Sequence, residues 1–152
     1  MVSFERLKYI REDNDITQAQ MAEILNVKRS TYSLWELGIN IIPLKYLSLF
    51  ADYFNYSLDY ILSLTNNRQN ILLKKGLDNK KIGNNIRYYR IKMKLSQKEL
   101  ADMLNVTQAC IVRYEKGLVS LPISNAYELS KIFNISINKL CGKEKNKELI
   151  NL

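Results

Sequence analysis

Four side chains in the second half of the chain have types and spacing that suit contact with another molecule. These residues are Gln108, Ala109, Val112 and Arg113. They fall on the face of a helical pattern opposite the apolar Ile111 and Tyr114. The glutamine amide and the arginine guanidinium can form paired hydrogen bonds of the kind that recognise base edges in a DNA groove. The pattern therefore predicts a short polar face that stands clear of a core.

The elements that must position this face lie within residues 95–122. Apolar residues recur at helical spacing up to Leu104, the period breaks at Asn105-Val106, and it then restarts until Gly117 ends it. This pattern predicts two short helices joined by a tight turn, which is a helix-turn-helix.

Polar residues stand where these two helices are predicted to begin. Ser96 can cap the first helix, with Glu99 closing a capping box, and Thr107 can cap the second helix. Asn105 tolerates the left-handed conformation that a short turn between helices requires. Helical hairpins are common, so this pattern alone does not separate core packing from DNA binding.

The same stretch resembles the helix-turn-helix of phage repressors and Cro proteins, a family also called Xre-like. The residues that carry the resemblance are Leu95-Ser96-Gln97-Lys98-Glu99-Leu100-Ala101, Leu104-Asn105-Val106-Thr107-Gln108, Ile111, Arg113-Tyr114-Glu115-Lys116-Gly117 and Pro122. The resemblance implies a five-helix domain of about 60 residues whose third helix, the recognition helix, enters the DNA major groove. The chain departs from the family at Asn105, where glycine is usual.

The first half of the chain repeats the second at an offset of 79 residues without a gap. Identical residues stand at Tyr9, Arg11, Gln18, Ala22, Leu25, Asn26, Val27, Glu36, Gly38, Pro43, Phe54, Asn55 and Ser57, and at Tyr88, Arg90, Gln97, Ala101, Leu104, Asn105, Val106, Glu115, Gly117, Pro122, Phe133, Asn134 and Ser136. The identities include caps, turns and core positions, which indicates one shared fold. We expect an all-α chain of two tandem five-helix domains of the lambda-repressor-like type.

The repeat also predicts where the parts of the chain begin and end. The predicted parts are a first domain at 1–64, a linker at 65–78, a second domain at 79–142 and a tail at 143–152. The predicted helices of the first copy run over about 3–14, 18–25, 29–37, 43–54 and a short segment after Ser57; those of the second run over about 79–92, 97–104, 108–116, 122–133 and 136–141. The linker is long enough to permit half-sites one DNA turn apart, but it does not fix the orientation of the two copies.

Charge separates the two halves of the chain. The net charge is +8, but residues 1–65 carry six basic and eight acidic side chains, whereas residues 66–152 carry 17 basic and seven acidic ones. The second half thus has a net charge of +10 and the first a net charge of −2. The basic charge lies in the same half of the chain as the clearer helix-turn-helix pattern, and this coincidence favours a polyanion as partner.

Composition argues against several other classes of protein. The chain has no histidine, which removes the commonest general base and metal ligand, and its two cysteines share no metal-ligand spacing. No run of about 18 apolar residues and no signal-peptide pattern occurs. We expect a cytoplasmic protein without enzymatic activity, metal, cofactor or membrane partner.

The family resemblance assigns roles to individual residues of the second copy. The implied base contacts are Gln108, Ala109, Val112 and Arg113, and the implied phosphate contacts are Gln97, Lys98, Thr107, Lys116 and Asn125, with Lys94 and Ser120 as further candidates. Glutamine can bond adenine, arginine can bond guanine, and alanine or valine can touch a thymine methyl group. In the first copy the corresponding candidates are Gln18, Lys28, Arg29 and Ser30. There Leu34 replaces Arg113, and we expect it to be exposed and to suit contact with a protein.

Two pairs of opposite charges recur at the same spacing. Arg11 and Glu36 are 25 residues apart, as are Arg90 and Glu115. The resemblance implies a structural ion pair at each position, which would orient the recognition helix without touching DNA.

These observations favour a bacterial or phage-type transcriptional regulator that binds double-stranded DNA. The second copy supplies most of the affinity in this interpretation, and a homodimer would double the contact area. The first copy then supplies a second half-site contact or a protein-binding surface. The alternative is a protein-interaction adaptor or antitoxin-like module whose first domain binds a protein partner.

Overall fold

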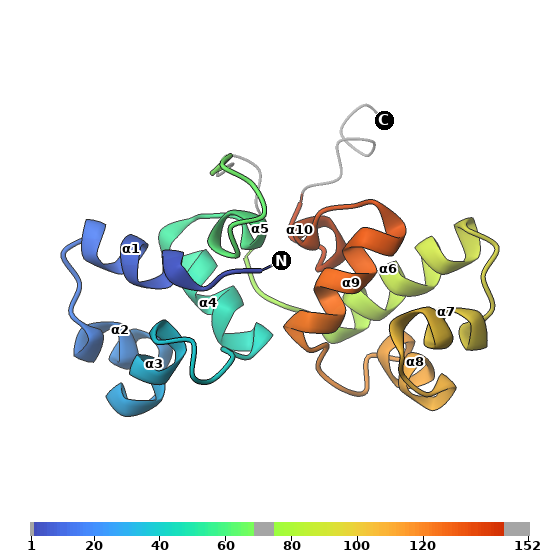
Figure 1. Ribbon diagram of the computed structural model, residues 1–152, viewed down its shortest axis with the longest axis horizontal. Helices are drawn as coiled ribbons and strands as arrows, with labels where there is room; N and C mark the ends of the chain where they lie inside the picture. The colour runs from blue at the N-terminus through green and yellow to red at the C-terminus, as the bar shows by residue number, and fades with distance from the viewer. Residues whose placement is uncertain (1, 69–74, 145–152) are drawn as a thin grey trace. The chain divides into compact units, whose positions relative to one another are not determined.

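The computed structural model describes residues 2–68 and 75–144, which form ten α-helices (Figure 1). No β-strand is formed within these two ranges, and the all-α prediction is confirmed. The chain divides into two compact units, Met1–Asn70 and Ile71–Leu152, which we call domain 1 and domain 2. Residues 69–74 of the predicted linker and 145–152 of the predicted tail lie outside the described residues.

The helices of the two domains follow the same order. Domain 1 contains α1 (Glu5–Asp13), α2 (Gln18–Leu25), α3 (Arg29–Glu36), α4 (Leu44–Phe54) and α5 (Leu58–Ile61). Domain 2 contains α6 (Asn79–Lys92), α7 (Gln97–Leu104), α8 (Gln108–Glu115), α9 (Ile123–Phe133) and α10 (Ile137–Leu140). Pro43 and Pro122, expected in the first turn of their helices, are instead the extended residues that precede them, with φ −63° and ψ 147° in both cases. No helix in the described part of the chain is long and apolar enough to cross a membrane.

Each helix contributes at least one completely buried side chain to the core of its domain. In domain 1 these residues include Leu7, Met21, Tyr32, Phe50 and Leu58; in domain 2 the residues at the same positions are Ile86, Leu100, Ile111, Leu129 and Ile137. Matched burial at an offset of 79 residues shows that the two copies pack around equivalent centres. Burial of these side chains removes apolar surface from water and supplies the main driving force for folding.

Side-chain caps begin the two helices of the helix-turn-helix in domain 2. Ser96 Oγ accepts a hydrogen bond from the Glu99 backbone N–H at 3.0 Å, and Thr107 Oγ1 accepts one from Cys110 at 3.2 Å. A complete capping box is formed in domain 1, where Thr17 Oγ1 accepts from Gln20 and the Gln20 side chain accepts in return from Thr17. The box predicted at Ser96 shows only the first of these two bonds in the structure.

The turn between the two helices is closed by an asparagine in both domains. Asn26 and Asn105 lie in the left-handed region, each with a φ of 56°. This conformation crowds the Cβ of most residues, and asparagine is among the few side chains that tolerate it. The departure from glycine at Asn105 therefore leaves the turn intact.

Helix α6 extends one turn further toward its N-terminus than α1 does, and this turn packs against α8. A Cβ atom placed on Gly83 would lie 2.5 Å from the Glu115 carbonyl oxygen and would also meet the carbonyl oxygen of Tyr114. Glycine thus permits α6 and the end of α8 to approach more closely than any other residue would.

The first residues of the predicted linker contact domain 1. Arg6 donates hydrogen bonds to the carbonyl oxygens of Tyr60 (2.6 Å) and Thr65 (2.7 Å) and to Asn66 Oδ1 (2.6 Å). The Arg6 guanidinium also lies 4.3 Å from the centre of the Tyr60 ring. These contacts hold residues 65 and 66 against α1 and α5.

Candidate nucleic-acid interface

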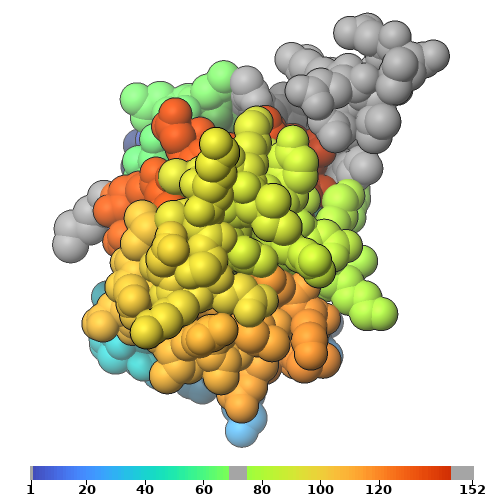
Figure 2. Space-filling view, turned by 90° about the vertical axis from the view of Figure 1, so that its right-hand side faces the viewer, coloured from blue at the N-terminus to red at the C-terminus, as the bar shows by residue number. Residues whose placement is uncertain are grey.

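Helix α8 presents a polar face to solvent. Gln108, Ala109 and Arg113 are exposed and Val112 is half-buried, while Ile111 and Tyr114 on the opposite side are buried in the core of domain 2. Figure 2 shows α7 in yellow, with α8 and the loop that follows it in orange, at the surface of this domain. The four predicted base-contacting residues therefore share one accessible helix.

A buried network fixes α8 relative to the two helices that precede it. Arg90 Nε on α6 donates to Glu115 Oε1 at 2.5 Å, and Arg90 Nη2 donates to Glu115 Oε2 at 3.3 Å. Gln97 Nε2 on α7 donates to the same Oε2 at 3.0 Å, and Arg90 Nη1 donates to the Leu95 carbonyl oxygen at 2.9 Å. The Arg90 and Glu115 side chains are only 12% and 6% exposed, so solvent screens this pair weakly.

Domain 1 contains the same network at the matched positions. Arg11 Nε donates to Glu36 Oε1 at 2.5 Å, Arg11 Nη2 donates to Oε2 at 3.1 Å, and Gln18 Nε2 donates to Oε2 at 3.0 Å. Arg11 Nη1 donates to the Ile16 carbonyl oxygen at 2.7 Å. The side chains of Arg11 and Glu36 are 8% and 2% exposed. Both recognition helices are thus held by a carboxylate at their last residue.

The network keeps Glu36 ionised. Burial disfavours the carboxylate, but the hydrogen bonds from Arg11 and Gln18, together with the positive charge of Arg11, outweigh burial and hold the pKa of Glu36 below its usual value. The hydrogen bond with Glu36 raises the pKa of Arg11, against the smaller effect of burial. Both groups are therefore charged at neutral pH.

The same network changes the role expected of Gln97. Its side-chain amide lies against Glu115, so one of its two N–H groups is already used within the domain. A phosphate contact from Gln97 would use the second N–H or the backbone N–H in the first turn of α7. Gln18 has the matching arrangement in domain 1.

The other predicted phosphate contacts are exposed or half-buried. Lys94, Lys98, Thr107, Lys116 and Ser120 are exposed, and Asn125 is half-buried. Asn125 Nδ2 donates to the Tyr114 hydroxyl at 2.9 Å, so this amide, like that of Gln97, is partly used within the domain. Direct contact with a phosphate stays a prediction for all of these residues.

The exposure expected for Leu34 in domain 1 is wrong. Lys28, Arg29 and Ser30 are exposed, but Leu34 is half-buried. Three strongly exposed apolar side chains lie just beyond α3, in the loop that leads to α4. They are Leu37, Ile39 and Ile41, which are 68%, 66% and 62% exposed.

A loop was predicted here, but its exposed apolar side chains were not, although a comparison of the two copies would have indicated them. Leu37 and Ile41 stand at the positions of Lys116 and Ser120 in domain 2, both of which were considered as phosphate contacts. A loop replaces helical periodicity with irregular backbone, so the pattern of apolar residues gave no indication of their exposure. A surface hollow lined by Lys28, Thr31, Trp35 and Tyr46, among others, lies beside the start of α3.

Within residues 2–68 and 75–144, no group of three or more histidine, cysteine, aspartate or glutamate side chains is arranged to hold a metal ion. Cys110 is half-buried on α8 and Cys141 is buried, and neither forms a disulfide bond. The exposed side chains of the two recognition helices include hydrogen-bonding and positively charged groups.

Comparison with known proteins agrees with this architecture. A sequence model of the helix-turn-helix family matches residues 7–61 and again residues 86–140. The uncharacterised HTH-type transcriptional regulator YobD of Bacillus subtilis (strain 168) is 32% identical over 73 residues, which make up 48% of this chain and 65% of YobD. The match thus spans slightly less than two thirds of that relative.

Solved structures match one part of the chain at a time. The restriction-modification controller protein C.AhdI from Aeromonas hydrophila matches with 25% identity and a TM-score of 0.39, over 41% of this chain and 96% of that protein. The hypothetical transcription factor NHTF from Neisseria matches with 18% identity and a TM-score of 0.44, over 53% of this chain and 97% of that protein.

Proposed function

Because the chain belongs to the helix-turn-helix family of the phage-repressor and Cro type, in two tandem copies, we propose that it is a sequence-specific transcriptional regulator that binds double-stranded DNA. In this proposal α8 enters the major groove, and Gln108, Ala109, Val112 and Arg113 contact base edges. Regulation follows from occupancy of the DNA, without a catalytic step.

The observation that carries the proposal is the contrast between the two sides of α8. Its inner side is fixed by the core and by the Arg90–Glu115 pair, while its outer side exposes a glutamine and an arginine. A rigid helix with exposed hydrogen-bonding groups is what discrimination between base pairs requires, because each bidentate contact depends on orientation. The net charge of +10 over residues 66–152 adds a favourable field for a polyanion.

Phosphate contacts would set the register of α8 in the groove. Lys98 near the start of α7 and Lys116 directly after α8 are both exposed. The N-terminus of α8, capped by Thr107, offers backbone N–H groups to an oxyanion. One recognition helix buries little surface, so the proposal includes a second one, supplied either by a homodimer or by domain 1 of the same chain. We also include a cytoplasmic location, because the chromosome is the expected ligand.

Binding-site selection from random duplex DNA tests this function. The full chain is expected to enrich one sequence motif at physiological salt, and its affinity is expected to fall steeply as salt rises. Arg113→Ala should lower affinity for the selected site by about 1–3 kcal/mol while leaving binding to unrelated DNA nearly unchanged. Arg87→Ala is the matched control, because it removes the same charge from an exposed position on α6. Enrichment of no sequence would refute the proposal.

A second candidate function rests on the loop after α3. Leu37, Ile39 and Ile41 expose three branched apolar side chains within five residues, which suits an adaptor whose first domain binds a protein. Replacing Leu37 by lysine and Ile41 by serine gives domain 1 the residues of domain 2 at these positions. A protein partner that binds the natural chain and not this variant, together with DNA affinity that lacks sequence preference, would favour the adaptor over the regulator.

A further inference from the structure

The two recognition helices carry different hydrogen-bonding groups at matched positions. At the first helical residue α3 has Arg29 where α8 has Gln108, and one turn later α3 has Leu34 where α8 has Arg113. The guanidinium group thus lies at the start of the helix in domain 1 and toward its end in domain 2. Arginine recognises guanine through a pair of hydrogen bonds. The different position of the arginine therefore predicts that the two domains prefer guanine at different positions of their half-sites.

The hydrogen bonds that hold the recognition helix in place are the same in the two domains. Arg11 and Arg90 each donate to the terminal glutamate of the recognition helix at 2.5 Å, and Gln18 and Gln97 each donate to the same carboxylate at 3.0 Å. The recognition helix is therefore fixed in a similar way within each domain. Differences in base preference come from the outward side chains, not from a change in how the helix is held.

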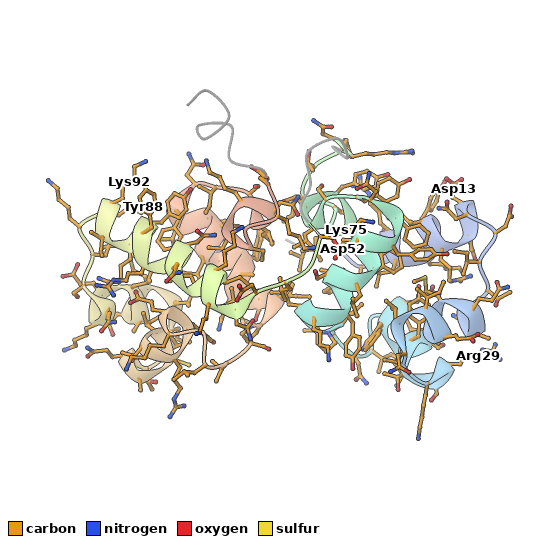
Figure 3. The ribbon with its side chains drawn as sticks, turned by 180° about the vertical axis from the view of Figure 1, so that it is seen from behind. Asp13, Arg29, Asp52, Lys75, Tyr88 and Lys92 are labelled. Atoms are coloured by element: carbon orange, nitrogen blue, oxygen red, sulfur yellow. The ribbon has the colours of Figure 1, made fainter. Side chains whose placement is uncertain are left out.

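The outward face of α3 is positive although domain 1 is acidic as a whole. Its one carboxylate, Glu36, is 2% exposed and paired with Arg11, while Lys28 and Arg29 are exposed at its start. Figure 3 shows Arg29 extending from α3, whereas Asp13 lies at the far end of α1. A duplex that approaches the start of α3 would therefore meet positive charge first.

Affinity and base preference are divided unequally between the domains. Asp15 stands where domain 2 has Lys94, and Leu37 stands where it has Lys116, so domain 1 has lost two of the cations that would hold phosphates. The groups that can contact base edges, Arg29 and Ser30, remain exposed. Domain 1 is thus equipped to discriminate between sequences while adding less to overall affinity.

We infer that one chain recognises an asymmetric duplex made of two unlike half-sites, one contacted by Arg29 and Ser30 of domain 1 and the other by Gln108 and Arg113 of domain 2. The inference rests on the proposed function, because it requires that the chain bind DNA with sequence preference. It goes further by stating that the operator is not a palindrome and that Arg29 is a specificity-determining residue.

Site selection with three matched arginine variants tests the inference. The full natural chain, Arg29→Ala, Arg113→Ala and the control Arg87→Ala are each used to select from the same random duplex pool. The natural chain and Arg87→Ala are expected to yield a motif with two unlike halves. Arg29→Ala should lose base preference in one half alone and Arg113→Ala in the other, each with a roughly 5- to 150-fold loss for the natural site.

A gain of new preference provides a second test. Replacing Arg29 by glutamine and Ser30 by alanine gives α3 the residues that begin α8, and the half-site of domain 1 is expected to change toward that of domain 2.

Native mass spectrometry of the natural chain on its selected duplex is expected to show one chain for each two-part site. Circular dichroism verifies that each variant remains folded.

The outcomes separate this inference from the proposed function. A motif that Arg29→Ala leaves unchanged, or a palindrome occupied by two chains, would overturn the asymmetric site while the chain remained a sequence-specific regulator. Selection of no motif by the natural chain would overturn both.

Discussion

Glu115, the last residue of α8, accepts hydrogen bonds from Arg90 on α6 at 2.5 Å and from Gln97 on α7 at 3.0 Å. One carboxylate therefore connects three helices of domain 2. Its side chain is 6% exposed, so the charge is compensated by protein groups and not by water. Glu36 makes the matching connection in domain 1.

Removal of this carboxylate charge should destabilise domain 2 strongly. Glu115→Gln keeps the shape of the side chain but leaves the Arg90 guanidinium buried without an ionic partner, for which we expect a loss of about 3–5 kcal/mol in the free energy of unfolding. Urea unfolding followed by circular dichroism measures the loss. Glu128→Gln, which removes a half-exposed carboxylate paired with Lys131 on α9, should change stability by no more than about 0.5 kcal/mol. Equal effects of the two substitutions would contradict the role given to Glu115.

The pH dependence of domain 1 should reflect Glu36. Its pKa is lower in the folded domain than in the unfolded chain, so the folded state binds fewer protons and gains stability as pH rises. This contribution is complete above the ordinary glutamate pKa and is lost as pH falls through the lower folded-state value. The fluorescence of Trp35, the single tryptophan, can follow urea unfolding of domain 1 between pH 7 and pH 3. We expect the decline at acid pH to be smaller in Glu36→Gln, and an identical decline in both proteins would count against this assignment.

At Asn105, the residue in the turn, glycine should preserve the stability of domain 2 and alanine should lower it. Its φ of 56° costs an alanine roughly 1–2 kcal/mol, whereas glycine adopts this region freely. We therefore expect Asn105→Ala to lower the melting temperature of domain 2 and Asn105→Gly to leave it nearly unchanged. Differential scanning calorimetry of the two variants measures this difference, and equal melting temperatures would show that the turn is not strained.

The contact between α6 and α8 should be sensitive to a single methyl group at Gly83. An alanine Cβ would lie 2.5 Å from the Glu115 carbonyl oxygen, so α6 and α8 would have to separate. Separation displaces the recognition helix, and we expect Gly83→Ala to lower both thermal stability and affinity for a selected DNA site. Asn84→Ala, at an exposed position on the same helix, is the control. A Gly83→Ala protein with unchanged affinity would show that α8 adjusts without loss of function.

The fold could be predicted from the sequence because several local signals agree at each helix. The caps at Thr17, Ser96 and Thr107, the asparagines in the turns and the repeated apolar positions all indicate the same helix-turn-helix. Because the first copy matches the second at an offset of 79 residues, the helices predicted in the second copy could also be assigned in the first. Exact helix ends, as at Pro43 and Pro122, depend on backbone angles that periodicity does not specify.

The candidate site was harder to predict because exposure depends on tertiary packing. Leu34 occupies the position of the exposed Arg113, yet it is half-buried, since an apolar side chain at the edge of a face can turn toward the core. Gln97 looked free to contact a phosphate, but its amide lies against Glu115, a residue 18 positions away. Such side-chain partners are set by the fold and are not visible in local spacing.

The position of the Arg90–Glu115 and Arg11–Glu36 pairs has a consequence for how new specificities can arise. The groups that hold each recognition helix are buried, and most of the side chains that face outward add nothing to the core. Under the proposed function, substitutions at Gln108, Ala109 and Arg113 are expected to change base preference without a penalty in folding. In a chain with two such domains, one recognition helix can then be redesigned while the other keeps its natural sequence.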